Sequence, residues 1–392
     1  MAMNAGRTVF AQLMDFLPLR EFRRCVKRYG GDYKIQHFTC LDQFLCLAFA
    51  QLTGRESLRD IEACLRAQGS KLYHMGFRGD ISRSNLAYAN ERRDCRIFAD
   101  FGRALIAMAR DLYRDESFSV EWAEAVYAMD STTIDLCLSL FPWAQFRRHK
   151  SAVKVHTLLD VATSIPASVY VTGAHVADVN LLDCLLLEPG AFYLMDRGYY
   201  DFARLYLFTQ ACAYFITRAK RDIQFRLRSH RAVDRTTGLR CDQTIRLTGP
   251  HTSRRYPAPL RRIHYVDPDQ HRDLVFLTNN FWLDPFTIAE LYRARWQVEL
   301  FFRWIKQHLH IKAFYGTSPN AVTIQVWVAL SVYLLVAIAK KHLAPDASLY
   351  QILQVLSITM FEKTAILEAF SHMPDSMPYT APASQLEMFD LR

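Results

Sequence analysis

Short β-type segments fill residues 124–219, and their order limits the fold more than any other feature of the chain. A strand, a turn and a second strand are predicted over Glu124–Leu138, and further strands over Ala152–Thr163, Ala167–Ala174, Ala191–Asp196 and Ala213–Ala219. Helices are predicted between the later strands, over Asn180–Pro189 and Phe202–Gln210. This order predicts an α/β fold, a mixed sheet with helices on both faces.

The first 95 residues are predicted to form a helical region. Apolar residues recur at helical spacing through Phe10–Leu17, Leu41–Leu52 and Leu58–Leu65, and a further amphipathic helix is expected over residues 97–113. The segment Gly76–Asp94 resembles the second half of a helix-turn-helix, in which Ser82 or Ser84 would cap a short helix. That helix would present Arg83, Asn85, Asn90, Arg92 and Arg93. We expect it to contact DNA, foremost through Arg83 and Asn85; a plain helical connector is the alternative.

Residues 220–273 differ from the rest in composition. They contain thirteen Lys or Arg residues and six Asp, a surplus of seven positive charges in a chain whose net charge is +9. Short strand-like runs alternate there with turn residues, which predicts a β-rich insertion. Such a charge surplus suits a phosphate backbone, and a solvated basic surface is the alternative. The residues expected to contact DNA are Arg254, Arg255, Arg261 and Arg262.

One long helix is predicted over Asp284–Leu309. Asp284 can accept the free N–H groups of the first turn, and Pro285 fits that turn because its missing donor costs nothing there. Four polar residues fall on a single stripe of this helix: Tyr292, Arg295, Glu299 and Lys306. A carboxylate flanked by these groups suits metal-assisted chemistry on phosphate. Taken alone, the stripe fits a solvated face with intrahelical ion pairs equally well.

Two aspartates stand at the ends of apolar runs, Asp130 after AVYAM and Asp196 after FYLM. Sites in sheets with parallel strands commonly lie at strand ends. With Glu299 they would supply three oxygen ligands of the kind that Mg²⁺ and Mn²⁺ prefer, and two such ions can activate a water or a 3′-hydroxyl. Competing acids that spacing does not exclude are Asp135, Asp160 and Asp201. The chain contains no P-loop and no His or Cys cluster suited to zinc.

Three segments together resemble the acidic blocks of the insertion-sequence-4 (IS4) family of bacterial DDE transposases: YAMDSTTIDL, YLMDRGYYDFARL and LYRARWQVELFFRWIKQHL. The last matches that family's Tyr-(2)-Arg-(3)-Glu-(6)-Lys pattern at Tyr292, Arg295, Glu299 and Lys306. The resemblance covers about Tyr127 to Phe314.

The resemblance implies an RNase H-like fold interrupted by a β-rich insertion, with Asp130, Asp196 and Glu299 as metal ligands. It also implies that Tyr292, Arg295 and Lys306 grip the transposon-end phosphates and help to position a flipped base. Such enzymes commonly release the element through a hairpin intermediate and stack that base on an aromatic residue of the insertion. Trp282 lies near the corresponding place, although a core role fits it at least as well.

The remaining features favour a cytoplasmic, nucleoid-associated protein. The nine cysteines are scattered without a CxxC pair, so reduced thiols are expected, and the first residues lack the apolar core of a signal peptide. The apolar run Ala321–Ala339 is nearly long enough to span a bilayer, but its polar interruptions favour a buried core helix. A second helical pattern over Leu349–Phe370 precedes a polar tail.

We therefore expect a cut-and-paste DNA transposase that cleaves and joins the inverted repeats of an insertion sequence, with two Mg²⁺ or Mn²⁺ ions, as a homodimer on double-stranded DNA. The alternatives are a catalytically inactive DNA-binding regulator of the same descent and a general RNase H-like nuclease. The expected division is a helical DNA-binding domain (1–95), a catalytic domain (96–219 and 274–345), the basic insertion (220–273) and a C-terminal helical segment with a tail (346–392).

Overall fold

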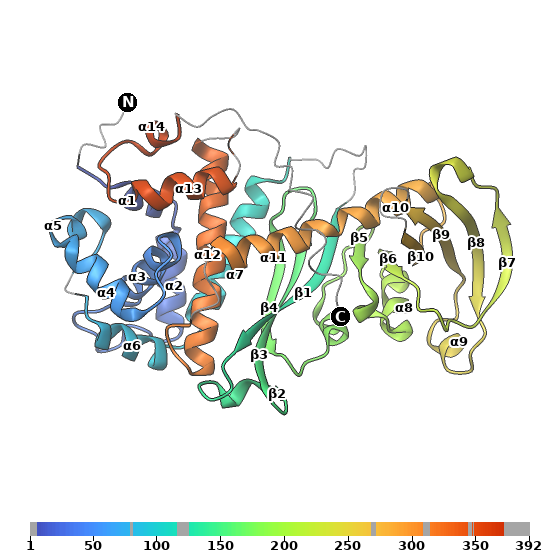
Figure 1. Cartoon of the computed structure of the whole chain (residues 1–392), viewed down its shortest axis with the longest axis horizontal. Coiled ribbons are helices and arrows are strands. Elements are labelled where there is room, and N and C mark those ends of the chain that lie inside the picture. The colour runs from blue at the N-terminus through green and yellow to red at the C-terminus, as the bar shows by residue number, and fades with distance from the viewer. Residues whose placement is uncertain are drawn as a thin grey trace.

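A mixed sheet organises the molecule (Figure 1). The computed structural model describes residues 6–78, 81–115, 125–267, 272–308, 314–343, 347 and 349–371, and within these ranges ten strands join one sheet. Neighbouring strands follow the order β2-β3-β1-β5-β6-β10-β9-β8-β7, and β4 pairs with β3. The strands are β1 (Val126–Leu136), β2 (Gln145–Arg147), β3 (Lys150–Asp160), β4 (Pro166–Gly173), β5 (Phe192–Met195), β6 (Tyr214–Arg218), β7 (Phe225–Arg231), β8 (Leu239–Leu247), β9 (Leu260–Asp267) and β10 (Arg272–Thr278).

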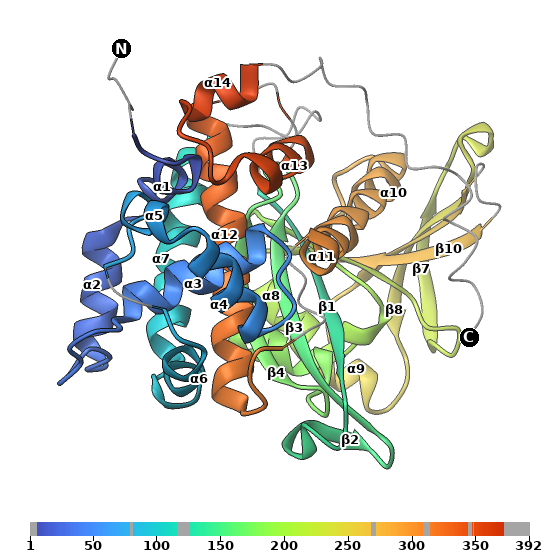
Figure 2. The same cartoon turned by 60° about the vertical axis from the view of Figure 1, so that its left-hand side comes forward.

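Helices form the N-terminal region and flank the sheet (Figures 1 and 2). The first group is α1 (Val9–Met14), α2 (Leu19–Arg28), α3 (Cys40–Leu52), α4 (Leu58–Ala67), α5 (Gly69–Leu72), α6 (Arg83–Arg92) and α7 (Arg96–Leu112). The later helices are α8 (Phe202–Gln210), α9 (Thr252–Arg255), α10 (Pro285–Ala294), α11 (Trp296–His308), α12 (Pro319–Leu343), α13 (Leu349–Thr359) and α14 (Ile366–Ser371). The predicted α/β class and the helical N-terminal region are confirmed.

The two faces of the sheet have separate cores. The centre is parallel, since β1 runs parallel to β5 and β5 to β6, whereas β3 pairs antiparallel with β1. Successive side chains alternate between the faces. Ala128, Leu194 and Ile216 belong to the core shared with α11 and α12, whereas Tyr193 and Phe215 belong to the core shared with α8. By this alternation, a residue two positions after Ala128 or Leu194 points toward α11.

The insertion continues the sheet. β10 pairs antiparallel with β6 at the edge of the parallel centre, and β9, β8 and β7 follow in turn (Figure 1). Arg261 on β9 is only 1% exposed, and its guanidinium binds both carboxylate oxygens of Asp242 on β8, at 2.7 and 2.8 Å. This burial contradicts the expectation that Arg261 faces DNA. The charge surplus of the segment does not show which of its basic side chains are buried in ion pairs.

α12 is the central helix between the N-terminal helices and the sheet (Figure 2). Of the helices in the described residues, α12 alone is long and apolar enough to cross a membrane. However, 94% of its most apolar stretch is buried within the molecule. Gly102 on α7 allows the close approach, because a Cβ there would lie 2.5 Å from the Trp327 ring. The prediction of a buried core helix is confirmed.

The C-terminal helices pack on the N-terminal ones. The predicted helical run over Leu349–Phe370 is divided into α13 and α14, because the segment between them bonds to α1 instead of continuing the helix. Glu362 and Met360 accept hydrogen bonds from the backbone N–H groups of Val9 and Phe10, at 2.9 and 3.2 Å. The predicted polar tail, from residue 372, lies outside the described residues.

Three other predictions differ from the structure. The strand, turn and strand over Glu124–Leu138 form one strand, β1, because β-branched Thr132 and Thr133 continue its pairing with β3; Glu124 itself lies outside the described residues. The helix over Asn180–Pro189 is replaced by a 3-10 turn, η3 (Asp178–Cys184), since Leu186 is 92% exposed and no apolar face continues.

The long helix over Asp284–Leu309 is divided at Arg295. The N–H of Arg295 bonds to the Tyr292 carbonyl and the N–H of Val298 to the Arg295 carbonyl, which are tight i→i−3 bonds between α10 and α11. Asp284 caps α10 as predicted. Leu309, the last residue of the predicted helix, lies outside the described residues.

Candidate active site

Three side chains stand in a row at the carboxyl ends of the parallel strands. Met129 of β1 pairs with Met195 of β5, and Met195 with Thr217 of β6. The residues that follow are Asp130, Asp196 and Arg218, so one register step brings two acids and a cation together. The sequence suggested that Asp130 ends its strand, but the strand continues beyond it. At Asp130, β1 stops pairing with β5 while it still pairs with β3.

Arg295 joins the acid on the sheet to the acid on the helix. The alternation of faces directs Asp130 toward α11, whose first turn carries Glu299. The Arg295 guanidinium donates to Asp130 Oδ2 at 2.9 Å and to Glu299 Oε1 at 2.6 Å. These side chains are 16%, 21% and 32% exposed, respectively. The ion pairs therefore lie in a shielded position, where charge interactions are stronger than at the surface.

The electrostatics of the row are suited to a cation. Burial, and to a lesser extent the charges of Asp196 and Glu299, raise the pKa of Asp130 to about 6, although Arg295 and the backbone N–H of Ser131 act in the opposite direction. Hard carboxylate oxygens of this kind favour divalent cations such as Mg²⁺ and Mn²⁺. Within the described ranges, no three acidic, His or Cys side chains are close enough to hold an ion as they stand, and Arg295 lies between two of the acids.

Asp196 is held by the turn that follows it. Its Oδ1 accepts the N–H of Gly198 at 2.7 Å and so caps the 3-10 turn η4 (Arg197–Tyr199). A Cβ on Gly198 would lie 3.0 Å from that oxygen, so only a residue without a side chain leaves the carboxylate this room.

The three competing acids have other roles or places. Asp201 caps α8 by accepting the N–H of Arg204 at 3.1 Å. Asp160 accepts backbone N–H groups in the turn after β3. Asp135 is exposed near the far end of β1.

Two further residues of the predicted stripe reach the same region. Tyr292 is 8% exposed; its ring packs against Phe276 with the centroids 4.8 Å apart, and the Arg295 guanidinium carbon lies 5.8 Å from its centroid. Lys306 donates to the Thr133 carbonyl of β1 at 2.9 Å. The structure thus brings all four stripe residues to the edge of the sheet where Asp130 lies.

The other predicted DNA contacts are distributed over two distant surfaces. Ser82 caps α6, which exposes Arg83 and Asn85, whereas Asn90 and Arg93 are buried in hydrogen bonds with Gln43. Their burial contradicts the expectation that α6 presents them.

In the insertion, Arg254 and Arg255 are exposed on α9, and Arg262 is half-buried and donates to Gln243 at 2.9 Å. Trp282 is 59% exposed and meets the rings of Phe192 and Tyr214 edge to face.

Sequence reasoning missed two residues at the site. Arg218 follows an apolar strand just as Asp196 does, so the same strand-end rule could have found it; its Nε is buried without a hydrogen-bond partner, and burial lowers its pKa. Asp178 accepts a hydrogen bond from Ser131, the neighbour of Asp130, at 2.7 Å. No spacing or composition signal points to Asp178, because it lies in an irregular segment.

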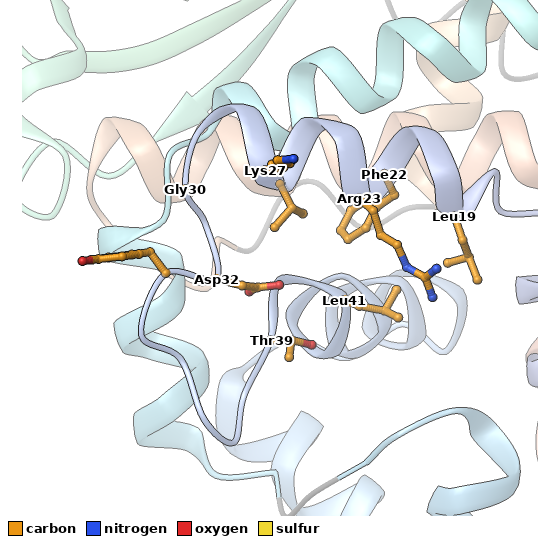
Figure 3. A pocket seen from close by; sticks show the side chains of 10 residues that line it. Leu19, Phe22, Arg23, Lys27, Gly30, Asp32, Thr39 and Leu41 are labelled. Atoms are coloured by element: carbon orange, nitrogen blue, oxygen red, sulfur yellow. The ribbon is translucent and has the colours of Figure 1, made fainter.

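A groove of about 500 Å³ lies elsewhere, in the N-terminal region between α2 and the start of α3 (Figure 3). Leu19, Phe22 and Leu41 line it, with Arg23 and Lys27 on α2 beside them. It contains none of the residues of the acidic row, so it is a feature of the helical region and not of the candidate active site.

Known proteins match both parts of the chain. Residues 121–335 match the family described as Transposase DDE domain, and residues 5–78 match one described as Domain of unknown function (DUF4372). A protein named transposase y4zB, of Sinorhizobium fredii, is 33% identical over 65% of this chain and 71% of its own length. Transposases named for the elements IS5377 of Geobacillus stearothermophilus and IS4SA of Synechocystis are 28% and 22% identical, over 59% and 90% of this chain and 61% and 95% of their own lengths.

The first of these family matches spans more than half of the chain and contains the whole acidic row. It also agrees with the RNase H-like arrangement of the central strands, and the relative named for IS4SA agrees with the resemblance to the IS4 family. Members of this family act on DNA and generally use divalent metal ions. The chain belongs to the DDE transposases.

Proposed function

We propose that this protein is a cut-and-paste transposase that binds the terminal inverted repeats of an insertion sequence, cleaves its ends and joins them to target DNA. One observation supports this most: Asp130 and Asp196 stand side by side on parallel strands, and Arg295 ties Asp130 to Glu299. Sequence segments separated by more than 160 residues thus converge at one sheet edge.

Asp130, Asp196 and Glu299 are the proposed ligands of two Mg²⁺ ions, for which Mn²⁺ can substitute. When bound, such ions activate an attacking water or 3′-hydroxyl and stabilise the leaving oxygen. Arg295 is a cation already held between Asp130 and Glu299, so ion binding would free its guanidinium for a phosphate. This exchange of Arg295 for a metal ion would explain why an arginine lies between two proposed metal ligands, since its guanidinium is also suited to bind a DNA phosphate.

The proposed DNA contacts are Tyr292, Arg295 and Lys306 beside the acids, Arg83 and Asn85 on α6, and Arg254, Arg255 and Arg262 in the insertion. Arg261 is left out because it is buried in its ion pair with Asp242. The division into a helical DNA-binding domain (1–95), a catalytic domain (96–219 and 274–345), the insertion (220–273) and a C-terminal segment (346–392) is part of the proposal. The β10 strand that crosses the second boundary would couple the insertion to the catalytic sheet.

A homodimer is proposed as the active form, because two DNA ends have to be joined in one complex. Of the helices after residue 321, α13 and α14 are the candidates for its interface, because α12 is buried in the core. The proposed place of action is the cytoplasm, on nucleoid DNA. The nine free cysteines of the described chain suit a reducing compartment.

The test is a cleavage assay on a duplex that carries the element's own end, compared with a scrambled duplex, in the presence of Mg²⁺. The proposal predicts nicking at the element boundary that Asp196→Asn and Glu299→Gln abolish. Tight end binding without any cleavage would instead favour the inactive regulator. Cleavage of both duplexes at equal rates would favour the general nuclease.

A further inference from the structure

A polar cluster lies on the opposite face of the sheet from Glu299, directly behind the acidic row. It comprises Ser131 on β1, Lys154 and His156 on β3, and Asp178 at the start of η3. Asp178 Oδ1 accepts the Ser131 hydroxyl at 2.7 Å and the Lys154 ammonium at 3.1 Å, and His156 Nδ1 lies 3.5 Å away. Lys154 and His156 lie two positions apart on β3, so they share a face, and both lie close to this carboxylate.

Asp178 connects to Asp130 through one residue. The N–H of Ser131 donates to Asp130 Oδ1 at 2.8 Å, while the hydroxyl of the same serine is held by Asp178. Arg295 holds the other oxygen of Asp130 from the opposite side of the sheet. The carboxylate of Asp130 is therefore fixed from both sides, and the contact on the Ser131 side does not depend on Arg295.

Asp178 also lies behind Asp196. The position of a Cβ on Gly198 would be 3.8 Å from Asp178 Oδ2 and 3.0 Å from Asp196 Oδ1, so both carboxylates border the same glycine. The hydroxyl of Tyr199 is buried beside them, and its pKa is raised by burial and by the charges of Asp130, Asp178 and Asp196.

The charge of Asp178 has a specific counterpart. Lys154 is 17% exposed, and its ammonium is bound by Asp178 and by the carbonyl of Val176. A largely buried ammonium without a carboxylate partner is costly. It would also add an uncompensated positive charge behind the row, where it would repel a divalent cation.

We infer that Asp178 is a positioning residue of the active site, which fixes Asp130 through Ser131 and neutralises Lys154 behind the proposed metal ligands. It binds neither the metal nor DNA itself. This inference rests on the proposed function of the acidic row.

The experiment is a Mn²⁺ titration of the full chain without DNA, in which free Mn²⁺ is followed by electron paramagnetic resonance. Asp178→Asn keeps an oxygen that accepts from Ser131 and Lys154, so a purely structural role predicts no change. The inference predicts about tenfold weaker Mn²⁺ binding, because the Lys154 charge is left uncompensated. Lys154→Met is predicted to bind Mn²⁺ at least as tightly as the parent. The double variant, Asp178→Asn with Lys154→Met, is predicted to have an Mn²⁺ affinity within about twofold of that of the parent.

Asp183→Asn is the matched control, since Asp183 lies in the same turn, is 52% exposed and pairs with Arg204. It should bind Mn²⁺ like the parent. Unchanged Mn²⁺ binding in Asp178→Asn would overturn the inference. Binding by the double variant that is as weak as in Asp178→Asn would also overturn it, because removal of the Lys154 charge would not restore binding if Asp178 were itself a metal ligand. If Asp178→Asn fails to fold, weaker binding by Lys154→Met would overturn it.

The same titration separates this inference from the proposed function. Asp196→Asn should lose Mn²⁺ binding if the row holds the metal. If Asp196→Asn binds like the parent, the proposed metal site is wrong. If Asp196→Asn loses binding while Asp178→Asn does not, only the role of Asp178 is wrong.

Discussion

At the scale of single residues, Arg295 links Asp130 on the sheet to Glu299 on α11. Burial disfavours its charge, but Tyr292, Asp130 and Glu299 outweigh that effect and raise its pKa. The guanidinium thus keeps two acids close that would otherwise repel each other.

Gly198 gives the first residue-scale prediction. Gly198→Ala would place a Cβ 3.0 Å from Asp196 Oδ1, so that carboxylate would have to shift by a few tenths of an ångström. We expect DNA cleavage to fall by roughly tenfold, because misplacement of a catalytic group by an ångström costs about 100-fold and this shift is smaller. Cleavage rates and thermal melting should be measured together. Unchanged cleavage in a folded variant would show that the position of Asp196 is not critical.

His156 gives a prediction about pH. Burial lowers its pKa to about 4, so the unfolded chain binds a proton between about pH 6.5 and 4 that the folded chain does not. The free energy of unfolding should therefore fall as the pH falls through this window, by up to about 3 kcal/mol from this group. His156→Gln should make the dependence shallower in denaturant titrations, and exposed His251→Gln should not. Equal slopes for the parent and His156→Gln would contradict the prediction.

At the scale of elements, local signals account for what the sequence could predict. The bounds of α8 are those predicted, because Asp201 supplies a cap and the apolar spacing is regular. Asp130 was misplaced at a strand end because Ser131-Thr132-Thr133 fits a turn and a strand equally well; pairing with β3 decides the outcome. The role of Asp178 depends on contacts with two distant strands, which no local pattern encodes.

The insertion shows why charge alone did not identify DNA contacts. Arg261→Met would leave Asp242 as a buried unpaired carboxylate, so we expect about 3–5 kcal/mol of destabilisation in denaturant unfolding. Exposed Arg254→Gln should change stability by less than about 0.5 kcal/mol. If Arg254 contacts a phosphate, its loss should also reduce the slope of log affinity against log salt by about 0.9. A stable Arg261→Met with a reduced salt slope would mean that Arg261 reaches DNA after all.

At the scale of the whole molecule, the two ends of the described chain close on each other. The buried side chain of Gln12 on α1 donates to the Thr364 carbonyl at 2.6 Å and accepts the Ile366 N–H at 2.9 Å. Gln12→Ala should destabilise the chain by about 1–3 kcal/mol, since buried partners lose their bonds. Exposed Gln36→Ala is the control. Equal stability of the two variants would show that this closure does not support the fold.

One continuous sheet joins the proposed catalytic domain to the basic insertion. The change in composition at residue 220 suggested a separate segment and did not predict this continuity. The strands of the insertion are continuous with β6, the strand that carries Arg218, through the pairing of β10 with β6. The helical region, by contrast, meets the sheet mainly through α7, which packs on β4, while α12 packs on α7 and α3.

The central claim, that Asp130, Asp196 and Glu299 hold the catalytic metal, is tested most directly by changing the ligand atom. A thiolate favours softer ions than a carboxylate does, so Asp196→Cys should lose cleavage in Mg²⁺ and recover at least about tenfold in Mn²⁺. Asp201→Cys, at the cap of α8, should show no such dependence on the metal. Cleavage by Asp196→Cys at the parent rate in Mg²⁺, or no difference between the two metals, would contradict the account.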